Sequence, residues 1–373
     1  MYNIEKIFGT CISQSSERRD FEKCFKVLHD NNLIEKYNEM DLIPIIYGRL
    51  QYFDIVSHDF EEKYMTKIQN EDKRLRSLHS CAQRISIILE ENDIDIIYLK
   101  NSAIGKIANL SLFENPMGDI DFLIREEDLK STKEIIAEYG EIISDHQFND
   151  KIDEFEIHFR TENFIHRFEF QTRPVSGRWL PEEQEPSGEI LWRKKRKILG
   201  TEEYTLSPEI LLLTVCLHTA KHSFIRSPGF RLHTDVDRLV RYDEIDWDIF
   251  ASLVNRFKVR TPIYISLLLS REFLGTKIPK HVFDLISINR FKFKLLMRSL
   301  NKAGFINPKN KKWNNFSYII FNIMLYDSFG ILFKHIFINR EKATQKFDLN
   351  ASQSIVIFNI KRILNLTFNR RNH

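Results

Sequence analysis

The chain has 373 residues, of which 43% are hydrophobic and 12% aromatic, and its formal net charge is +3. This length and composition allow two or three domains with buried cores and exclude a disordered chain. The four cysteines, Cys11, Cys24, Cys81 and Cys216, are scattered, which excludes a disulfide framework or a cysteine zinc motif. No basic segment followed by an apolar run opens the chain, so we expect no signal peptide and a cytoplasmic protein.

Residues 1–90 are predicted to be helical. Apolar residues recur at helical spacing in FEKCFKVLHDNNLIEKY and in RLRSLHSCAQRISIILEEN, with no alternation typical of strands. We expect three further regions along the chain: a core with a sheet at 91–204, a helical domain at 205–288 and a basic helical segment at 289–373.

The core is predicted to alternate strands and helices. DIDIIYLK and GDIDFLI are short apolar runs typical of buried strands, and each precedes a stretch with a helical pattern. The second of these helices opens with acidic residues and ends at Gly140. DEFEIHFR and HRFEFQTR alternate polar and apolar residues around the turn at 161–163, which indicates a hairpin. The sequence therefore predicts an α+β protein with a small mixed sheet.

The C-terminal half is predicted to be helical beyond Pro208 and basic at its end. Residues 289–373 hold sixteen Lys or Arg against three Asp or Glu, so contact with nucleic acid or an anionic membrane is a possible role besides that of a solvated face. The apolar stretch 316–338 is interrupted by Asn322, Asp327 and Lys334. A lone spanning helix would bury these residues in lipid, so we expect buried or amphipathic helix and no transmembrane segment.

Two aspartates in GDIDFLI are the leading candidates for chemistry. Asp119 and Asp121 are two residues apart, which on a strand places both carboxylates on one face while Ile120 and Phe122 point into the core. A divalent cation relieves their repulsion, and Mg²⁺ prefers a few carboxylates together with substrate phosphates. A DxD pattern alone also fits an ordinary polar strand face.

The strand end at 98–106, YLKNSAIGK, supplies a possible anion site. Lys100, Asn101 and Ser102 stand where a strand ends and a helix begins, and backbone amides at a helix start suit the phosphates of a nucleotide. Lys100 could add charge or only end the strand. A third carboxylate is needed for a metal and for the proton of an acceptor; Glu169 is our choice and Glu156 its rival.

Two further pairs have less specific patterns. His218 and His222 are four residues apart on a predicted helix, a spacing that can bind zinc, but no glutamate of a metalloprotease helix and no third ligand accompany them. For His218 and His222 we favour a structural or substrate-facing role over metal binding. Asp235 and Asp237 are expected to cap a helix or to pair with these histidines or with Lys221.

The combined motifs resemble the uncharacterised bacterial nucleotidyltransferases of the DNA polymerase beta superfamily. The matching segments, between about residues 40 and 280, are YLKNSAIGK, NPMGDIDFLI, FEFQTRP, LSPEILLLTVCLHTAKH and IDWDIF. The resemblance implies a polymerase-beta-like core flanked by N-terminal helices and a C-terminal helical domain. It further implies two Mg²⁺ ions on Asp119, Asp121 and Glu169, which are then also the catalytic residues. The triphosphate would be held by Lys100, Asn101, Ser102 and Gly118.

Two positions depart from the family pattern. Asn101 stands where the family has Gly, so its side chain could crowd the phosphates, and Asn115 stands where members commonly have Arg, which removes a possible phosphate contact.

The expected function is magnesium-dependent transfer of a nucleoside monophosphate from a nucleoside triphosphate, with release of pyrophosphate. ATP is the expected donor, and a small molecule or a peptide or protein the expected acceptor. Transfer to RNA is one alternative because the C-terminal segment is basic. A catalytically inactive protein that binds a nucleotide or a partner is another, and a purely structural helical protein is a third.

Overall fold

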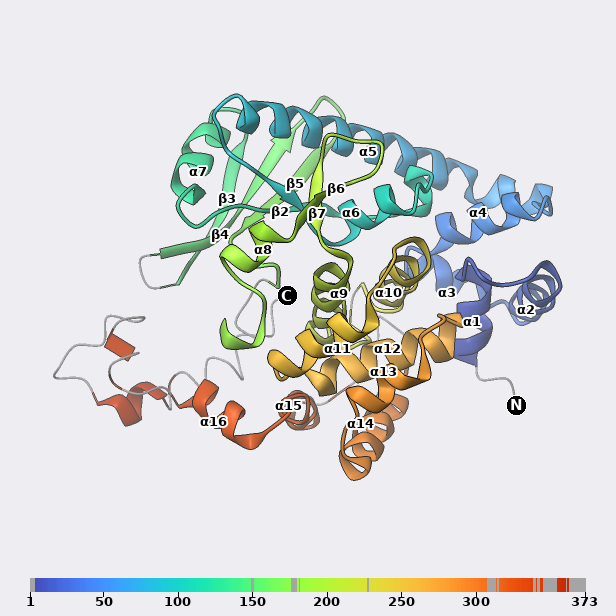
Figure 1. Ribbon diagram of the computed structural model, residues 1–373. Coiled ribbons are helices and arrows are strands. Elements are labelled where there is room, and N and C mark those ends of the chain that lie inside the picture. The colour runs from blue at the N-terminus through green and yellow to red at the C-terminus, as the bar shows by residue number, and fades with distance from the viewer. Residues whose placement is uncertain are drawn as a thin grey trace.

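The computed structural model describes residues 4–148, 151–175, 180, 182–226, 228–306, 313, 315–337, 340, 343–344, 354–359 and 361. It is an α+β structure in which helices from both ends of the chain pack together beside one five-stranded sheet (Figure 1). The predicted fold class is confirmed.

Five helices precede the sheet in the described part of the chain, as predicted. They are α1 (Ile4–Ile12), α2 (Arg18–Asp30), α3 (Ile34–Glu39), α4 (Ile43–Tyr52) and α5 (His58–Glu90). The longest, α5, begins at Ser57, whose side chain accepts a hydrogen bond from the Phe60 amide and so caps the helix. Asp59 and Glu61 in its first turn complement the positive end of the helix dipole.

The sheet has the order β1-β2-β5-β4-β3 and mixes parallel and antiparallel pairs. Its strands are β1 (Ile97–Tyr98), β2 (Asp119–Leu123), β3 (Glu141–Phe148), β4 (Lys151–Arg160) and β5 (Ile165–Gln171). Only β2 and β5 pair in parallel, and the other neighbours are antiparallel. The helix α6 (Lys100–Ile107) follows β1, the 3-10 turn η1 (Leu112–Glu114) precedes β2, and α7 (Leu129–Ala137) precedes β3.

The two faces of the sheet differ sharply in polarity. Facing pairs on β2, β5 and β4 place Phe122, Phe168, Phe170 and Phe155 on one side, and all four are fully buried. The helix α5 runs along this side of the sheet (Figure 1). The opposite side carries the charged residues of the same strands, because successive side chains of a strand alternate between faces. Strand alternation thus separates the hydrophobic core from a polar face.

Two strand features were not expected from the sequence. The edge strand β3 pairs with β4, although EIISDHQF shows little alternation. A second, two-stranded sheet joins β6 (Lys195–Lys197) to β7 (Tyr204–Leu206), after the 3-10 turn η2 (Glu182–Gln184) and α8 (Glu189–Arg193). It joins the first sheet to the following helices: β7 lies beside β1, and the Thr205 hydroxyl donates to the Tyr98 carbonyl over 3.0 Å.

The remaining described elements are helices, again as predicted. They are α9 (Pro208–Lys221), α10 (Arg231–Tyr242), α11 (Trp247–Arg256), α12 (Arg260–Leu274), α13 (Lys280–Leu285), α14 (Arg290–Ala303), α15 (Asn315–Met324) and α16 (Phe329–Ile336). The apolar stretch 316–338 is divided between α15 and α16. Within the described residues, none of the helices combines the length and the apolar character that crossing a bilayer requires.

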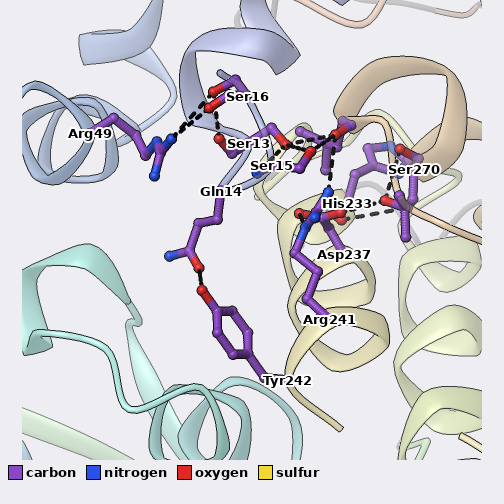
Figure 2. A network of polar contacts seen from close by, with 12 residues as sticks. Ser13, Gln14, Ser15, Ser16, Arg49, His233, Asp237, Arg241, Tyr242 and Ser270 are labelled. Carbon is purple, nitrogen blue, oxygen red and sulfur yellow. Dashed lines mark hydrogen bonds and ion pairs between the residues drawn. The ribbon is translucent and has the colours of Figure 1, made fainter. Parts of the chain in front are cut away.

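The first and last helical regions are joined directly by polar contacts (Figure 2). After α1, the Ser13 hydroxyl donates to the Leu274 carbonyl at the end of α12 over 2.6 Å, and the Tyr242 hydroxyl bonds to Gln14. The helices approach closely, since a Cβ added to Gly9 would lie 2.0 Å from the Phe273 carbonyl oxygen. The N-terminal helices therefore pack on the C-terminal helices as well as on the sheet.

Candidate active site

The polar face of the sheet gathers the carboxylates singled out in the sequence. Asp119 and Asp121 lie on β2, with Ile120 between them fully buried on the other face. Asp121 is only 6% exposed, whereas Asp119 at the start of the strand is open to solvent. One carboxylate is thus held inside the protein and the other lies at its surface.

Strand register distinguishes the two candidate glutamates. Glu169 on β5 is the direct partner of Asp121 across the parallel pair, so its carboxylate emerges beside that of Asp121. Glu156 faces Glu169 from the next strand, β4, one strand further from Asp121. The Glu156 carboxylate is engaged by Arg167 at 2.7 Å and by His158 at 3.1 Å. The geometry favours Glu169 over Glu156 as the third carboxylate.

Lys100 reaches into this group from the start of α6. Its ammonium lies 2.5 Å from Asp121 Oδ1 and 3.8 Å from Glu169 Oε2, and its side chain is 11% exposed. Its backbone has a φ of 50°, in the left-handed region, which costs a non-glycine residue about 1–3 kcal/mol. The strained corner between β1 and α6 turns this side chain toward the carboxylates.

The electrostatics of Lys100 and Asp121 follow from burial and from the excess of carboxylates. Burial raises the pKa of Asp121 above its usual range; the charge of Lys100 opposes this shift, and Glu169 and Asp119 add to it. Burial lowers the pKa of Lys100, but the charges of Asp121 and Glu169 outweigh that effect and raise it overall. Lys100 therefore stays charged, and the charges of Lys100 and Lys221 together oppose those of the three carboxylates. The remaining negative charge suits a further cation.

The donor chemistry fits a divalent cation, but Lys100 holds part of the space between the donors. Carboxylate oxygens from two adjacent strands are the ligands that Mg²⁺ prefers. Among the described residues, no three acidic, histidine or cysteine side chains stand close enough together to hold a metal as they are arranged. A cation between Asp121 and Glu169 would take the place of the Lys100 ammonium, which lies 2.5 Å from the first carboxylate and 3.8 Å from the second.

The start of α6 lies next to these carboxylates. The Leu99 amide donates to the Asp121 carbonyl over 3.1 Å, which ties the helix start to β2. The Ser102 hydroxyl donates to the Leu99 carbonyl over 2.7 Å, so this side chain shapes the turn. Gly118, just before β2, is exposed, and no atom lies within 4 Å of where its Cβ would be. The backbone amides of α6 and this open glycine border the same side of the site.

The side chains of the two positions that depart from the family pattern each donate to a backbone carbonyl of the other's segment. The Asn101 amide donates to the Pro116 carbonyl over 2.9 Å, and the Asn115 amide donates to the Asn101 carbonyl over 3.0 Å. Asn115 in turn accepts from Arg238 of α10 at 2.8 Å. Sequence reasoning missed Arg238, since nothing in its local pattern links it to a residue 123 positions earlier.

The end of α9 forms the opposite wall. Burial and the charge of Lys100 lower the pKa of Lys221, while the charge of Glu169 raises it, so this helix end faces the carboxylates. His218 and His222 lie nearby, with ring centroids 4.8 Å apart. The Nδ1 atom of His218 is buried and has no hydrogen-bond partner among the described residues.

The expected roles of two aspartates on α10 need correction. Both lie inside the helix and cap neither end. Asp237 binds Arg241 at 2.8 Å and accepts from the Thr276 hydroxyl at 2.6 Å, so it does not pair with the histidines or with Lys221. Asp235 lies 3.9 Å from Arg238. Asp237 belongs to the junction with the N-terminal helices, and one of its two partners, Thr276, lies 39 residues further along the chain (Figure 2).

Comparison with known proteins points to one family. The model of the uncharacterised nucleotidyltransferase family matches residues 28–275, more than half of the chain. A search of curated proteins gives no significant match. Among solved structures, the antibiotic-resistance factor ANT(2'')-Ia is similar with 12% identity and a TM-score of 0.32, covering 60% of this chain and 97% of its own. A nucleotidyltransferase-like protein from Paracoccidioides brasiliensis is similar with 14% identity and a TM-score of 0.35, covering 58% and 97%.

The match to the family model includes the site described above. It covers β2 with both aspartates, the start of α6, β5 with Glu169, and the facing ends of α9 and α10. The nucleotidyltransferase assignment expected from the motifs is thereby confirmed. The chain belongs to the uncharacterised nucleotidyltransferase family.

Proposed function

We propose that this nucleotidyltransferase moves a nucleoside monophosphate from a magnesium-bound nucleoside triphosphate, ATP by preference, to a small-molecule or peptide or protein acceptor. The observation that carries the proposal is the position of Asp121 and Glu169 side by side on parallel strands, beside the start of α6. We further propose that it acts in the cytoplasm. The working division of the chain is 1–90, 91–204, 205–288 and 289–373, supported by the confinement of the main sheet to 97–171.

Each group in the site has a proposed role. Asp119, Asp121 and Glu169 would hold two Mg²⁺ ions, which supply charge neutralisation and polarise the reacting phosphoryl group. Gly118 leaves room for the phosphates, and the backbone amides at Lys100, Asn101 and Ser102 bind their oxygens. Lys100 leaves Asp121 and donates to a phosphate oxygen.

The transfer step follows from these roles. An acceptor oxygen attacks the α-phosphorus, and the bond from that phosphorus to the bridging oxygen of pyrophosphate breaks. Glu169 takes the acceptor proton. Lys221 and His218 line the opposite wall of the site, on α9. Through these two residues the helical wall contacts the acceptor or the departing pyrophosphate.

The test follows label from each of the four α-labelled nucleoside triphosphates into a small-molecule extract, a protein extract and total RNA. Wild type should label the first or second with Mg²⁺ present, and the double variant Asp119→Asn, Asp121→Asn should label none. Glu156→Gln is the matched carboxylate control and should retain transfer, because Arg167 and His158 occupy that side chain. Equal labelling by wild type and the double variant would refute the proposal. Labelling of RNA alone would move the acceptor to nucleic acid.

A further inference from the structure

The loop that leads into β2 is held at three backbone carbonyls by side chains from three helices. Arg238 of α10 donates to the Glu114 carbonyl at 2.5 Å, and Asn101 of α6 donates to the Pro116 carbonyl at 2.9 Å. Arg74 of α5 donates to the Met117 carbonyl. This segment, in which Asn115, Pro116 and Met117 are buried, directly precedes the metal-binding strand proposed above.

Arg238 is the most deeply buried of these donors, with 2% of its surface exposed. One nitrogen of its guanidinium donates to the Asn115 side chain at 2.8 Å and another to the Glu114 carbonyl. Both acceptors are neutral, and the Asp235 carboxylate lies 3.9 Å away, beyond hydrogen-bond distance. Burying a guanidinium that has no hydrogen-bonded carboxylate costs free energy. We therefore expect Arg238 to have a role that requires its burial at this position.

Asn115 connects Arg238 to the start of α6 through hydrogen bonds. Its side-chain oxygen accepts from Arg238, and its amide donates to the Asn101 carbonyl in the first turn of α6. The fit is tight, since a Cβ on Gly105 would lie 2.1 Å from the Asn115 amide nitrogen. A continuous series of hydrogen bonds therefore runs from α10 through Asn115 to α6, and from α6 back to the loop at Pro116.

These contacts fix two parts of the site relative to each other. The start of α6 carries Lys100 and the amides proposed for the phosphates, and the loop ends at Asp119. A guanidinium can hold two acceptors at once in a planar fork, which a lysine cannot do. Arg238 thus sets the separation between the phosphate-binding turn and the carboxylate strand.

We propose that Arg238 is a positioning residue for the nucleotide site, acting from α10 through Asn115 without touching the nucleotide. The inference rests on the proposed function. On this proposal α10 contributes to nucleotide affinity, although it belongs neither to the DxD motif nor to the start of α6. Asn101 and Asn115 then help to order the phosphate-binding turn, and their presence does not mean that phosphate contacts have been lost.

Isothermal titration of wild type and Arg238→Met with magnesium-bound ATP tests the proposal. Arg241→Met is the matched control, because Arg241 lies one turn along the same helix and pairs with Asp237, away from the turn. Both variants should melt at lower temperature than wild type. Only Arg238→Met should lose nucleotide affinity, by about tenfold or more for the folded protein, whereas Arg241→Met should stay within about twofold.

Asn115→Ala keeps the inference testable if Arg238→Met does not fold, since it breaks the same series of bonds and removes little volume. It should weaken binding comparably, and Arg238→Lys should lie between wild type and Arg238→Met. Unchanged affinity in both Arg238→Met and Asn115→Ala, or in Asn115→Ala alone if Arg238→Met does not fold, would overturn the positioning role. If wild type binds none of the four nucleotides under any condition, the proposed function has failed instead, and with it the basis of this inference.

Discussion

The two faces of the central sheet are made by the same three strands and have opposite physical characters. One face buries Phe122, Phe168, Phe170 and Phe155 completely, and adjacent rings pack at centroid distances such as 4.8 Å between Phe155 and Phe170. The other face places Asp121 and Glu169 on neighbouring strands beside the ammonium of Lys100, with Asp119 exposed at the start of β2. The packed aromatic rings stabilise the fold, whereas the repulsion between the carboxylates destabilises it.

This difference separates stability from function within one sheet. Removing aromatic area from water contributes about 25 cal/mol per Å², so the apolar face supplies free energy of folding. Like charges held close together cost free energy until a cation or a substrate joins them. Changes on the polar face should therefore affect chemistry more than stability, and changes on the apolar face should do the reverse.

The largest expected effect comes from Asp121→Asn on the polar face. Nucleotide transfer should fall by about 10³-fold, since metal-ion catalysis contributes several kcal/mol to the barrier. The free energy of unfolding should change little, because the lost attraction of Lys100 is offset by the lost burial cost and the lost repulsion from Glu169 and Asp119. Transfer assays and urea denaturation measure the two quantities. Loss of stability without loss of transfer would contradict a catalytic role for the polar face.

Next is Phe168→Ala on the apolar face. The free energy of unfolding should fall by about 3–5 kcal/mol, because a fully buried aromatic side chain is removed and a cavity remains. Transfer per folded molecule should change little. Ile165→Ala is the control on the same strand: its side chain is 52% exposed, so the change should stay within about 0.5 kcal/mol. Equal losses from the two variants would contradict this account of the core.

Lys100→Met tests the role of the buried ammonium on the polar face. Without the ammonium that contacts Asp121, this side chain no longer competes with a cation for the carboxylates, and binding of Mn²⁺ alone should tighten by about tenfold. The metal-free protein should lose stability and regain it on addition of Mn²⁺. Metal titration followed by electron paramagnetic resonance measures the affinity. Weaker Mn²⁺ binding would show that Lys100 does not compete with the metal.

A smaller effect concerns pH and a histidine on the apolar face. Burial and the charge of Arg74 lower the pKa of His166 from its ordinary 6.5, and its Nε2 lies 2.7 Å from the Ser77 hydroxyl. The unfolded chain therefore binds this proton more readily than the folded protein does. The contribution of neutral His166 to the free energy of unfolding is fully present above pH 6.5. It decreases as pH falls below 6.5, by at most about 1.4 kcal/mol per pH unit for one proton. His166→Gln should lessen the slope of unfolding free energy against pH, and an unchanged slope would exclude His166 as a cause.

Much of the sheet could be predicted because alternation is local. The strands β1, β2, β4 and β5 follow from short apolar runs or alternating residues, and the side-by-side position of Asp119 and Asp121 on one face needs only the period of a strand. The edge strand β3 lacks that pattern, and the strands of the ribbon β6–β7 have three residues each. Pairing with neighbours, which sequence reasoning does not see, decides these elements.

The site itself was only partly predictable. The carboxylates and the helix start lie in short motifs, so their proximity could be expected. The ion pair of Lys100 with Asp121 depends on a left-handed backbone at residue 100, for which the residue type gives no signal. Arg238 could not be found because its contact with Asn115 is made only when α10 packs on α6.

We propose that the carboxylate face of the sheet binds a nucleoside triphosphate together with a divalent cation. Thermal unfolding of wild type and Asp121→Asn, with each of the four nucleoside triphosphates in the presence and absence of Mg²⁺, measures this binding. A nucleotide at 100 times its dissociation constant should stabilise wild type by about 2.7 kcal/mol. The account predicts that this stabilisation requires Mg²⁺ and is lost in Asp121→Asn. Stabilisation of equal size in both proteins, or none with any nucleotide, would contradict it.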